Sequence, residues 1–387
     1  WPYAYDAALN VRHDLEDYQP LISNIESSAR YEATNGVQGD YYFCTGTLRV
    51  EMTNSATVIA GLQRAVSNYG ATIGSHNGGL VNPNNPSLVL SNYDYWHWGP
   101  DEALDVTPAG YASGKAYAFT SISNSFVDLA GWVPALTNGI RSWVGCYFNS
   151  IREDSYDVLE QLKVKTAGEQ KLGPFPHWTV STRTAGKRYS SVSLPLTDWF
   201  VGSQIAQSME AGHTVSSVHD AVDYYYGLGG LINIYSHSLS DGSGQVGGLL
   251  QEYIRYSVAK PRVWSTNAVG VYAWWLSRSN AQVTASSSTN GGQAVTTFSI
   301  KGATDPRTAV EILMPQPSCY GVQVLTNGVV ASANSFRING QVVKLLVGTA
   351  VTNAEIRYTT APVAVSDLYY TMQDAALTAP APGVLSN

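Results

Sequence analysis

Acidic side chains close the first apolar segment of the chain, which begins at Ala8. In its final stretch "RHDLED", Arg12, Asp14 and Glu16 occupy alternate positions. Because side chains along a strand alternate between its two faces, these three would share one face, opposite His13. Carboxylates placed in this way could act as a general base or hold a cation. A carboxylate here could instead form an ion pair with Arg12 or cap a helix.

Two other apolar segments end in histidine. "ATIGSH" ends in His76 and runs into the glycines of "NGG", and "LINIYSH" ends in His237. A histidine at a strand end most often packs or hydrogen-bonds, but imidazole is also a common metal ligand and transfers protons near neutral pH. Arg141 stands near the start of "IRSWVGCYF", and Asp198 follows "SVSLPLT". The shared position of these groups at strand ends favours a single site.

Strand and helix patterns alternate over residues 8–277, in about seven or eight units by the usual periodicity criteria. Examples are a predicted strand over residues 41–50, a helix over 55–70 and a helix over 154–166. Such alternation predicts a parallel sheet, here a distorted (β/α) barrel of about seven strands. The carboxyl ends of its strands would then bring the polar groups together.

The pattern changes after residue 280. Short alternating segments such as "QAVTTFSIKG" and "SFRINGQVVKLLVG" are separated by Gly and Asn-Gly turns. These signals are typical of antiparallel strands and predict a small all-β sandwich. The expected organisation is therefore a barrel over residues 1–280 and an accessory β-sandwich domain over 281–387.

Composition limits the possible partners. The net charge is −7 and no cluster of Lys and Arg occurs, which argues against nucleic acid. No apolar run approaches the roughly 20 residues that a transmembrane helix needs. Charged residues make up only 13% of the chain, while it holds 25 Tyr and 10 Trp. This balance is typical of secreted or cell-surface proteins that handle neutral polymers such as polysaccharides.

In order and spacing, these segments resemble the polysaccharide deacetylase (NodB-homology) superfamily over residues 8–277. The resemblance implies that Asp14 is the general base, that Arg141 orients it and that His237 is the catalytic acid. It further implies that Asp198 and Trp199 flank the acid. A divalent metal ion, zinc before others, would be bound by Glu16 or Asp17 and by His76.

The chain departs from the family pattern at the metal site. The family's second motif carries another histidine four residues after the first, and here that position is Leu80. His97 in "YDYWHWGPDEALD" is the candidate replacement, with Asn77 a weaker one. Glu16 stands where Asp is usual, so Asp17 is an alternative ligand.

The resemblance implies a metal-dependent deacetylase acting on an N-acetylated polysaccharide, and less favourably on an O-acetylated one. Glycines 78 and 79 would leave room for a sugar chain beside His76. Four tryptophans are candidates for stacking on sugar rings: Trp96, Trp98, Trp143 and Trp199.

Two other functions stay open. A glycoside hydrolase needs two carboxylates and no metal, and Asp101 with Glu102, or Asp14 with Glu16, could supply them. Leu80, at the position of a metal ligand, suggests a carbohydrate-binding protein that has lost catalysis.

Overall fold

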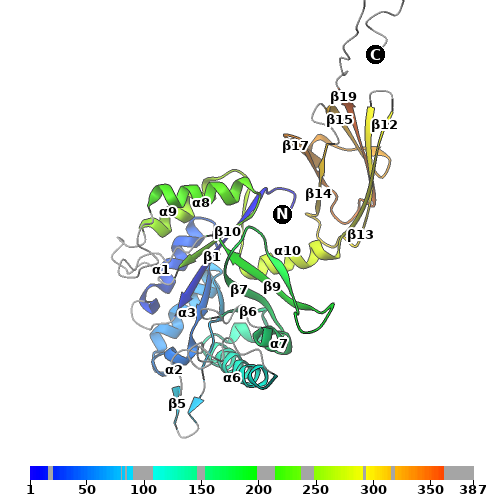
Figure 1. Cartoon of the computed structure of the whole chain (residues 1–387). Helices are drawn as coiled ribbons and strands as arrows, with labels where there is room; N and C mark the ends of the chain where they lie inside the picture. The colour runs from blue at the N-terminus through cyan, green and yellow to red at the C-terminus, as the bar shows by residue number, and fades with distance from the viewer. Residues whose placement is uncertain are drawn as a thin grey trace, which may run out of the picture. The chain divides into compact units, whose positions relative to one another are not determined.

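The computed structural model describes residues 1–15, 21–79, 81–82, 85–89, 108–145, 153–197, 214–236, 248–290, 293–314 and 319–360. The chain forms two compact units, Trp1–Leu276 and Ser277–Asn387 (Figure 1). The boundary expected after residue 280 falls at the end of helix α10 (Ala268–Asn280), four residues beyond the observed division.

One mostly parallel sheet forms the centre of the first unit. Its strand order is β10-β1-β2-β3-β6-β7-β9-β8, and β11 pairs with the start of β1. The strands are β1 (Ala7–Leu15), β2 (Asp40–Phe43), β3 (Thr72–Ser75), β6 (Arg141–Val144), β7 (Val164–Leu172), β8 (His177–Val180), β9 (Arg188–Leu196), β10 (Leu231–Ser236) and β11 (Val263–Ser265). The run from β10 to β9 is parallel throughout, and only β8 is antiparallel, to β9.

The sheet curves until β9 approaches β10, the first strand of the order. The Asn233 backbone N–H donates to Thr197 Oγ1 at 2.6 Å, and the Thr197 N–H donates to the Asn233 carbonyl at 3.2 Å. These bonds join the end of β9 to β10 without a regular ladder between them. The predicted fold, a distorted and nearly closed (β/α) barrel of about seven strands, is confirmed.

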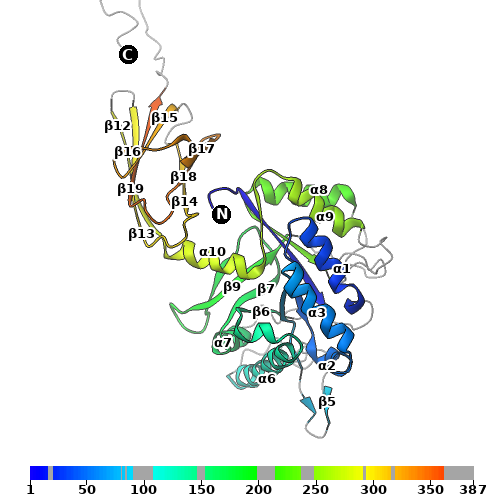
Figure 2. The same cartoon turned by 180° about the vertical axis from the view of Figure 1, so that it is seen from behind.

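Helices surround the sheet, and the pairs α1/α3, α6/α7 and α8/α9 pack side by side (Figures 1 and 2). Their bounds are α1 (Leu21–Thr34), α2 (Thr45–Thr53), α3 (Ala56–Tyr69), α6 (Pro108–Trp132), α7 (Glu153–Gln161), α8 (Val215–Gly227) and α9 (Gly248–Ala259). Local sequence sets some ends directly. Ser55 caps α3 by accepting from the Val58 N–H, and Gly70 ends it with a φ of 70°. None of the described helices is long and apolar enough to cross a membrane.

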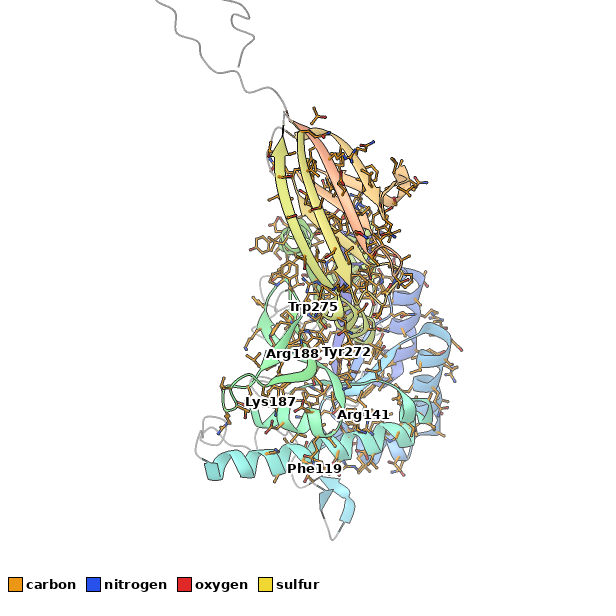
Figure 3. The ribbon with its side chains drawn as sticks, turned by 90° about the vertical axis from the view of Figure 1, so that its right-hand side faces the viewer. Phe119, Arg141, Lys187, Arg188, Tyr272 and Trp275 are labelled. Atoms are coloured by element: carbon orange, nitrogen blue, oxygen red, sulfur yellow. The ribbon has the colours of Figure 1, made fainter. Side chains whose placement is uncertain are left out.

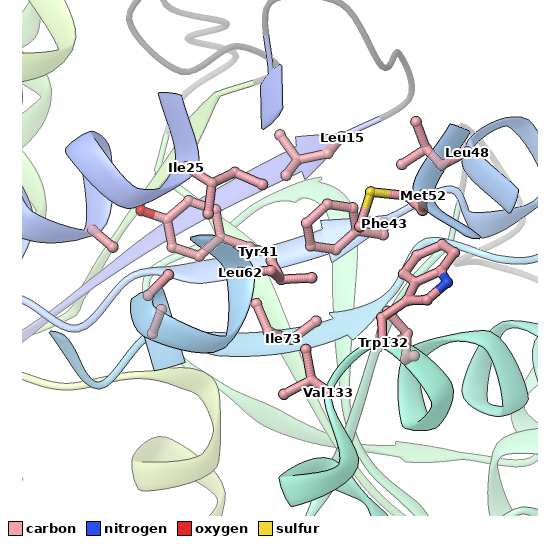
Figure 4. Close-up of a cluster of buried hydrophobic side chains, with 14 residues drawn as sticks. Leu15, Ile25, Tyr41, Phe43, Leu48, Met52, Leu62, Ile73, Trp132 and Val133 are labelled. Atoms are coloured by element: carbon pink, nitrogen blue, oxygen red, sulfur yellow. The ribbon is translucent and has the colours of Figure 1, made fainter. Parts of the chain in front are cut away.

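Alternation along the strands separates two environments. Leu15, Tyr41, Phe43 and Ile73 point toward α1, α2, α3 and α6 and form an apolar core with residues such as Leu62 (Figure 4). The strand residues between them therefore face the barrel interior. That interior set contains Arg12, Asp14, Tyr42 and Gly74, all of them polar, aromatic or small.

The amino ends of the strands are closed by α10. Ala268 and Val271 of this helix pack against Ala8, Leu194 and Leu231. Further along α10, Tyr272, Trp274 and Trp275 join a second apolar cluster that also contains Val192 and Trp178, with Arg188 over the Trp178 ring (Figure 3). The opposite, carboxyl end is left for the polar groups.

Two expected elements are corrected. The predicted strand over residues 41–50 ends at Phe43, and α2 starts at Thr45. The predicted helix over 154–166 ends at Gln161, and β7 starts at Val164. In the second case Lys163 has a positive φ of 59°, which breaks the helix just before the strand.

The connection after β3 contains a short hairpin of β4 (Val81–Asn82) and β5 (Asn85–Val89). A 3-10 helix, η1 (Pro134–Asn138), joins α6 to β6.

The second unit consists of antiparallel sheets, as predicted. One has the order β12-β13-β19-β15-β16 and the other β14-β18-β17. Side chains from both sheets, such as Phe298, Ile356, Val343 and Leu345, form a shared core, so the unit is a β-sandwich. The elements are β12 (Gln282–Asn290), β13 (Gln293–Lys301), β14 (Ala309–Leu313), β15 (Cys319–Thr326), β16 (Val329–Val330), η3 (Ala333–Ser335), β17 (Phe336–Asn339), β18 (Val342–Leu346) and β19 (Asn353–Thr360).

Candidate functional site

A buried ion pair lies inside the barrel near the carboxyl end of β1. Arg12 Nε donates to Asp14 Oδ1 at 2.7 Å, and Arg12 Nη2 donates to Asp14 Oδ2 at 2.5 Å. Arg12 is 2% exposed and Asp14 is 1% exposed. The two residues are two positions apart in a strand, which places both side chains on one face. The planar guanidinium therefore holds both oxygens of the carboxylate in one orientation.

Groups from β7, across the barrel, and from the neighbouring strand β10 hold Arg12. Its Nη1 donates to the backbone oxygen of Glu169 in β7 at 2.9 Å, and its guanidinium lies 5.1 Å from the ring centroid of Tyr235 in β10. Gly168 leaves room for it, because a Cβ there would lie 3.0 Å from Arg12 Nη1 and 2.6 Å from Val144 Cγ2. Contacts between β1 and β7 cross the interior, since β2, β3 and β6 separate these strands in the sheet.

The charge of Arg12 is permanent in this environment. Burial alone would lower the pKa of Arg12, but the charge of Asp14 and its hydrogen bond raise that pKa above the ordinary value. Asp14 therefore has a cationic partner at neutral pH.

His76 follows β3, two positions after the inward-facing Gly74. The register aligns Gly74 with Tyr42, and Tyr42 with Asp14, so His76 lies slightly beyond the level of Asp14. Its Nδ1 lies 2.9 Å from the Val144 carbonyl, and its backbone N–H donates to the Phe43 carbonyl at 2.8 Å. A carbonyl only accepts, so Nδ1 carries a proton, and in the neutral imidazole the ring lone pair is then on Nε2. That is the arrangement common among metal-binding histidines.

The turn after His76 is anchored to α6. Asn77 has a φ of 71°, and its Oδ1 accepts from Trp143 Nε1 at 2.5 Å. The N–H groups of Gly78 and Gly79 donate to Ser121 Oγ at 3.2 and 3.0 Å. A Cβ on Gly78 would lie 2.7 Å from the backbone nitrogen of Ser125. Gly78 thus allows close packing on a helix, which corrects the expectation that it clears a path for sugar, whereas the same expectation for Gly79 stays a prediction.

Asn77 was the weaker candidate for a metal ligand. Because its Oδ1 holds the Trp143 indole and its carbonyl accepts from the Thr45 N–H at 3.0 Å, its side-chain oxygen is engaged in fixing the turn.

Arg141 and Trp143 face away from Asp14, so their predicted roles are corrected. Arg141 Nη1 donates to the Leu162 carbonyl at 3.1 Å, and its guanidinium stacks 4.9 Å from the ring centroid of Phe126 in α6. Trp143 is 0% exposed and packs in a helix-side cluster, so it offers no surface to a sugar. The physical reason is alternation along β6, which turns Ser142 and Val144 inward and their neighbours outward. Arg12 occupies the place beside Asp14 that the prediction gave to Arg141.

Most of the other predicted site residues lie outside the described residues. They are Glu16, Asp17, Leu80, Trp96, His97, Trp98, Asp101, Glu102, Asp198, Trp199 and His237. Within the described ranges, no group of three or more His, Cys, Asp and Glu side chains could hold a metal ion. The donor set there fits a metal in one respect: His76 is oriented as a nitrogen ligand.

The sequence interpretation missed two interior side chains, Tyr42 and Tyr235, and the backbone oxygen of Glu169 that accepts from Arg12. The Tyr42 ring fills the space above Gly74, where a Cβ would lie 2.5 Å from Tyr42 Cδ1. Burial, followed by the charge of Asp40, raises the pKa of Tyr42 well above its ordinary value, so its phenol stays neutral. Alternation along β2 was the available signal for Tyr42, whereas no sequence signal marked the backbone oxygen of Glu169.

No protein-family model matches this chain, and a search of curated proteins finds no match. Solved structures do match. The similarity to a Mycobacterium smegmatis protein assigned as a polysaccharide deacetylase covers 72% of this chain and 93% of that protein, at 13% sequence identity and a TM-score of 0.49. The similarity to a Pseudomonas aeruginosa PAO1 protein with the same assignment covers 71% of this chain and 92% of that protein, at 12% sequence identity and a TM-score of 0.47. The similarity to an allantoinase covers 71% of this chain and 92% of that protein, at 12% sequence identity and a TM-score of 0.46.

At these identities the similarity concerns the fold. The chain is a (β/α)-barrel protein with a C-terminal β-sandwich, and polysaccharide deacetylases are among the solved structures that it resembles.

Proposed function

We propose that this protein is a carbohydrate deacetylase that removes acetyl groups from an N-acetylated polysaccharide. The observation that carries the proposal is the Asp14 carboxylate, which Arg12 orients inside the barrel at the carboxyl end of β1. This is the position that the order of the sequence motifs gives to the general base. Low charge and many aromatic residues suit a protein that acts on neutral polymer outside the cell.

In the proposed reaction, Asp14 takes a proton from the attacking water, and Arg12 holds the carboxylate in position for this transfer. Each Asp14 oxygen has a second lone pair beyond the one that Arg12 uses, so the base function is compatible with the ion pair. The bond between the acetyl carbon and the sugar nitrogen breaks, and acetate and a free amine are released. We assign the proton for the leaving amine to His237, with Asp198 and Trp199 beside it.

A divalent ion, zinc before others, is part of the proposal. His76 would bind it through Nε2, with Glu16 or Asp17 and His97 as further ligands. Such an ion would supply positive charge that polarises the acetyl carbonyl. The hydrogen bond from His76 Nδ1 to Val144 supports this assignment because it orients the ring and raises the basicity of Nε2. Trp96, Trp98 and Trp199 would contact the sugar chain.

The test is acetate release from a panel of acetylated polysaccharides, with and without a chelator. Asp14→Asn should lower the rate by about 10²–10⁴-fold, the usual contribution of a general base. His76→Gln should lower both the rate and the zinc content after dialysis. Urea unfolding of each variant shows whether the loss of rate reflects loss of fold.

The proposal fails if wild-type protein loaded with zinc releases no acetate from any member of the panel. Release of reducing ends without acetate, unaffected by chelation, would instead indicate a glycoside hydrolase.

A further inference from the structure

A cavity of about 300 Å³ lies on the helix side of the barrel wall, where β7, β8 and β9 meet α7. Carboxylates, cations, hydroxyls and aromatic rings line it together. Five of them carry the argument below: Tyr156, Glu169, Lys171, His177 and Thr179. No predicted catalytic or metal-binding residue is among the lining residues.

A half-buried ion pair between Glu169 and His177 lines the cavity. Glu169 is 3% exposed, and its Oε1 lies 3.3 Å from Nε2 of His177, whose side chain is 49% exposed. Tyr156 Oη donates to the same oxygen at 3.4 Å. Burial alone would raise the pKa of Glu169, but the His177 hydrogen bond and charge hold it below the ordinary value, and the same hydrogen bond raises the pKa of His177. Both shifts favour the charged forms of Glu169 and His177.

Hydroxyl groups form a hydrogen-bonded network beside this ion pair. Tyr156 Oη lies 2.9 Å from Ser193 Oγ, and Thr179 Oγ1 lies 2.7 Å from the same atom. Burying a carboxylate costs folding free energy that an apolar residue would not cost. A polar network of this kind that opens into a cavity is more typical of a binding site than of a core.

The lining selects a class of ligand. The carboxylates Glu153 and Glu169 balance the cations Lys171 and His177, so the cavity does not favour a phosphate or a bare cation. The cavity is at the small end of ligand pockets, which span about 300–1,000 Å³, so the ligand is small. Hydrogen-bond donors and acceptors of both charges, beside the ring of Tyr156, suit a polyhydroxylated ring with polar edges and an apolar face.

We infer that this cavity binds one neutral pyranose residue of a polysaccharide, as a site separate from the Arg12–Asp14 pair. The inference rests on the proposed function only for the origin of the sugar, which is taken to be the polymer that the barrel acts on.

Glu169 links the two sites. Its side chain points into the cavity, while its backbone oxygen accepts from Arg12 Nη1 at 2.9 Å. The β7–β9 ladder is irregular between Gly168 and Leu172, which allows one residue to serve both faces of the strand. A sugar in the cavity therefore contacts the residue that holds Arg12 in place.

The experiment uses the full chain and chitotetraose, an N-acetylglucosamine tetramer, as the probe. Histidine ring resonances are followed during titration, and the His177 signal is identified by its loss in His177→Gln. We expect that signal to shift with saturation in the wild type. Lys171→Ala, followed by the same His177 signal, should weaken binding at this site about tenfold, the effect of losing one hydrogen bond to a charged group.

His219→Gln is the matched control. His219 also pairs with a carboxylate, Glu252, at 2.6 Å, but it lies on α8, away from the cavity. This variant should bind chitotetraose as the wild type does. A His177 signal that stays unmoved with chitotetraose, glucose and xylose overturns the inference, and so does a signal that moves with acetate or phosphate alone.

Acetate release from a short acetylated substrate is measured in parallel. Release that persists while the cavity binds no sugar overturns the inference and leaves the proposed function standing. Sugar binding at His177 without any acetate release supports the inference and overturns the proposed function.

Discussion

At the residue scale, the different roles of Arg12 and Arg141 depend on the residues that surround each of them in the folded chain. Arg12 forms a bidentate pair with Asp14 inside the barrel, whereas Arg141 stacks on Phe126 outside it. Both are bonded to a backbone carbonyl, of Glu169 and Leu162 respectively. Only the first can orient the proposed base.

Replacing each arginine with lysine separates their roles. Arg12→Lys keeps the charge but cannot donate to both Asp14 oxygens and to Glu169 at once. We expect kcat to fall by about tenfold or more, the rate equivalent of about 1.4 kcal/mol in transition-state stabilisation. Arg141→Lys should leave kcat within about twofold, because it removes only an outer contact worth under about 1 kcal/mol. Steady-state acetate release measures both, and equal losses would place the orienting role elsewhere.

Gly168 tests the same pair from the opposite wall. Gly168→Ala would place a methyl group against Arg12 and Val144, and we expect a loss of about 1–3 kcal/mol in unfolding free energy, as for overpacked cores, together with lower kcat. Gly131→Ala is the control, since no atom lies within 4 Å of a Cβ added at that exposed position of α6. It should stabilise the helix by up to about 1 kcal/mol. Urea unfolding compares the two, and a neutral Gly168→Ala would contradict the observed packing.

At the scale of elements, the turn after β3 is held by α6 and by β6 together. Trp143 from β6 and Ser121 from α6 bind Asn77, Gly78 and Gly79 directly. Arg49 of α2 adds a bond to the Gly78 carbonyl at 3.2 Å. His76 thus takes its position from three elements that are far apart in sequence.

Trp143→Phe removes the donor to Asn77 while keeping an aromatic ring in the core. The buried Asn77 oxygen would then lack this hydrogen bond, at a cost of about 1–3 kcal/mol in unfolding free energy. We also expect weaker zinc binding, because the turn that carries His76 loosens. Zinc affinity and urea unfolding report the two effects. A variant with raised KM but unchanged stability and zinc affinity would point back to sugar stacking by Trp143.

The misassigned elements have a common physical cause. In the sequence, Tyr41, Phe43, Thr45 and Thr47 stand at alternate positions, which extends the strand pattern beyond Phe43. In the folded chain, α2 begins at Thr45, and Leu48 and Met52 are buried together on one face of this helix. Short apolar segments satisfy both periods, so only the tertiary core selects between them.

At the scale of the barrel unit, Asp40 ties the closing helix α10 to the sheet. Its Oδ2 accepts from the Ala268 N–H at 2.8 Å, at the first residue of α10. Burial raises the pKa of this carboxyl to about 8, and the Ala268 hydrogen bond lowers it only in part. The native state therefore keeps a proton on Asp40 that the unfolded chain releases at much lower pH.

This predicts a pH dependence of stability. Asp40 has a higher pKa in the folded protein than in the unfolded chain, so its protonation stabilises the fold fully at a pH below about 4, the unfolded pKa. This stabilisation declines as the pH rises to about 8, the folded pKa. Asp40→Asn keeps an oxygen for Ala268 and has no proton to lose, so its advantage over the wild type should grow between pH 5 and pH 8. The slope of the difference should be at most about 1.4 kcal/mol per pH unit. Urea midpoints of both proteins across this range test it, and a difference independent of pH would contradict it.

Local pattern by itself determined the alternating barrel, the β-sandwich, the cap and stop of α3, and the shared face of Arg12 and Asp14. These properties depend on the period of a strand or helix and on residues a few positions apart. Only the tertiary structure decided that Arg12 rather than Arg141 holds Asp14, that Trp143 is buried, and that Gly78 packs on α6. Those outcomes depend on which strand faces which across the barrel and on the residue at which each strand starts. A shift of one position turns every side chain of a strand to its other face.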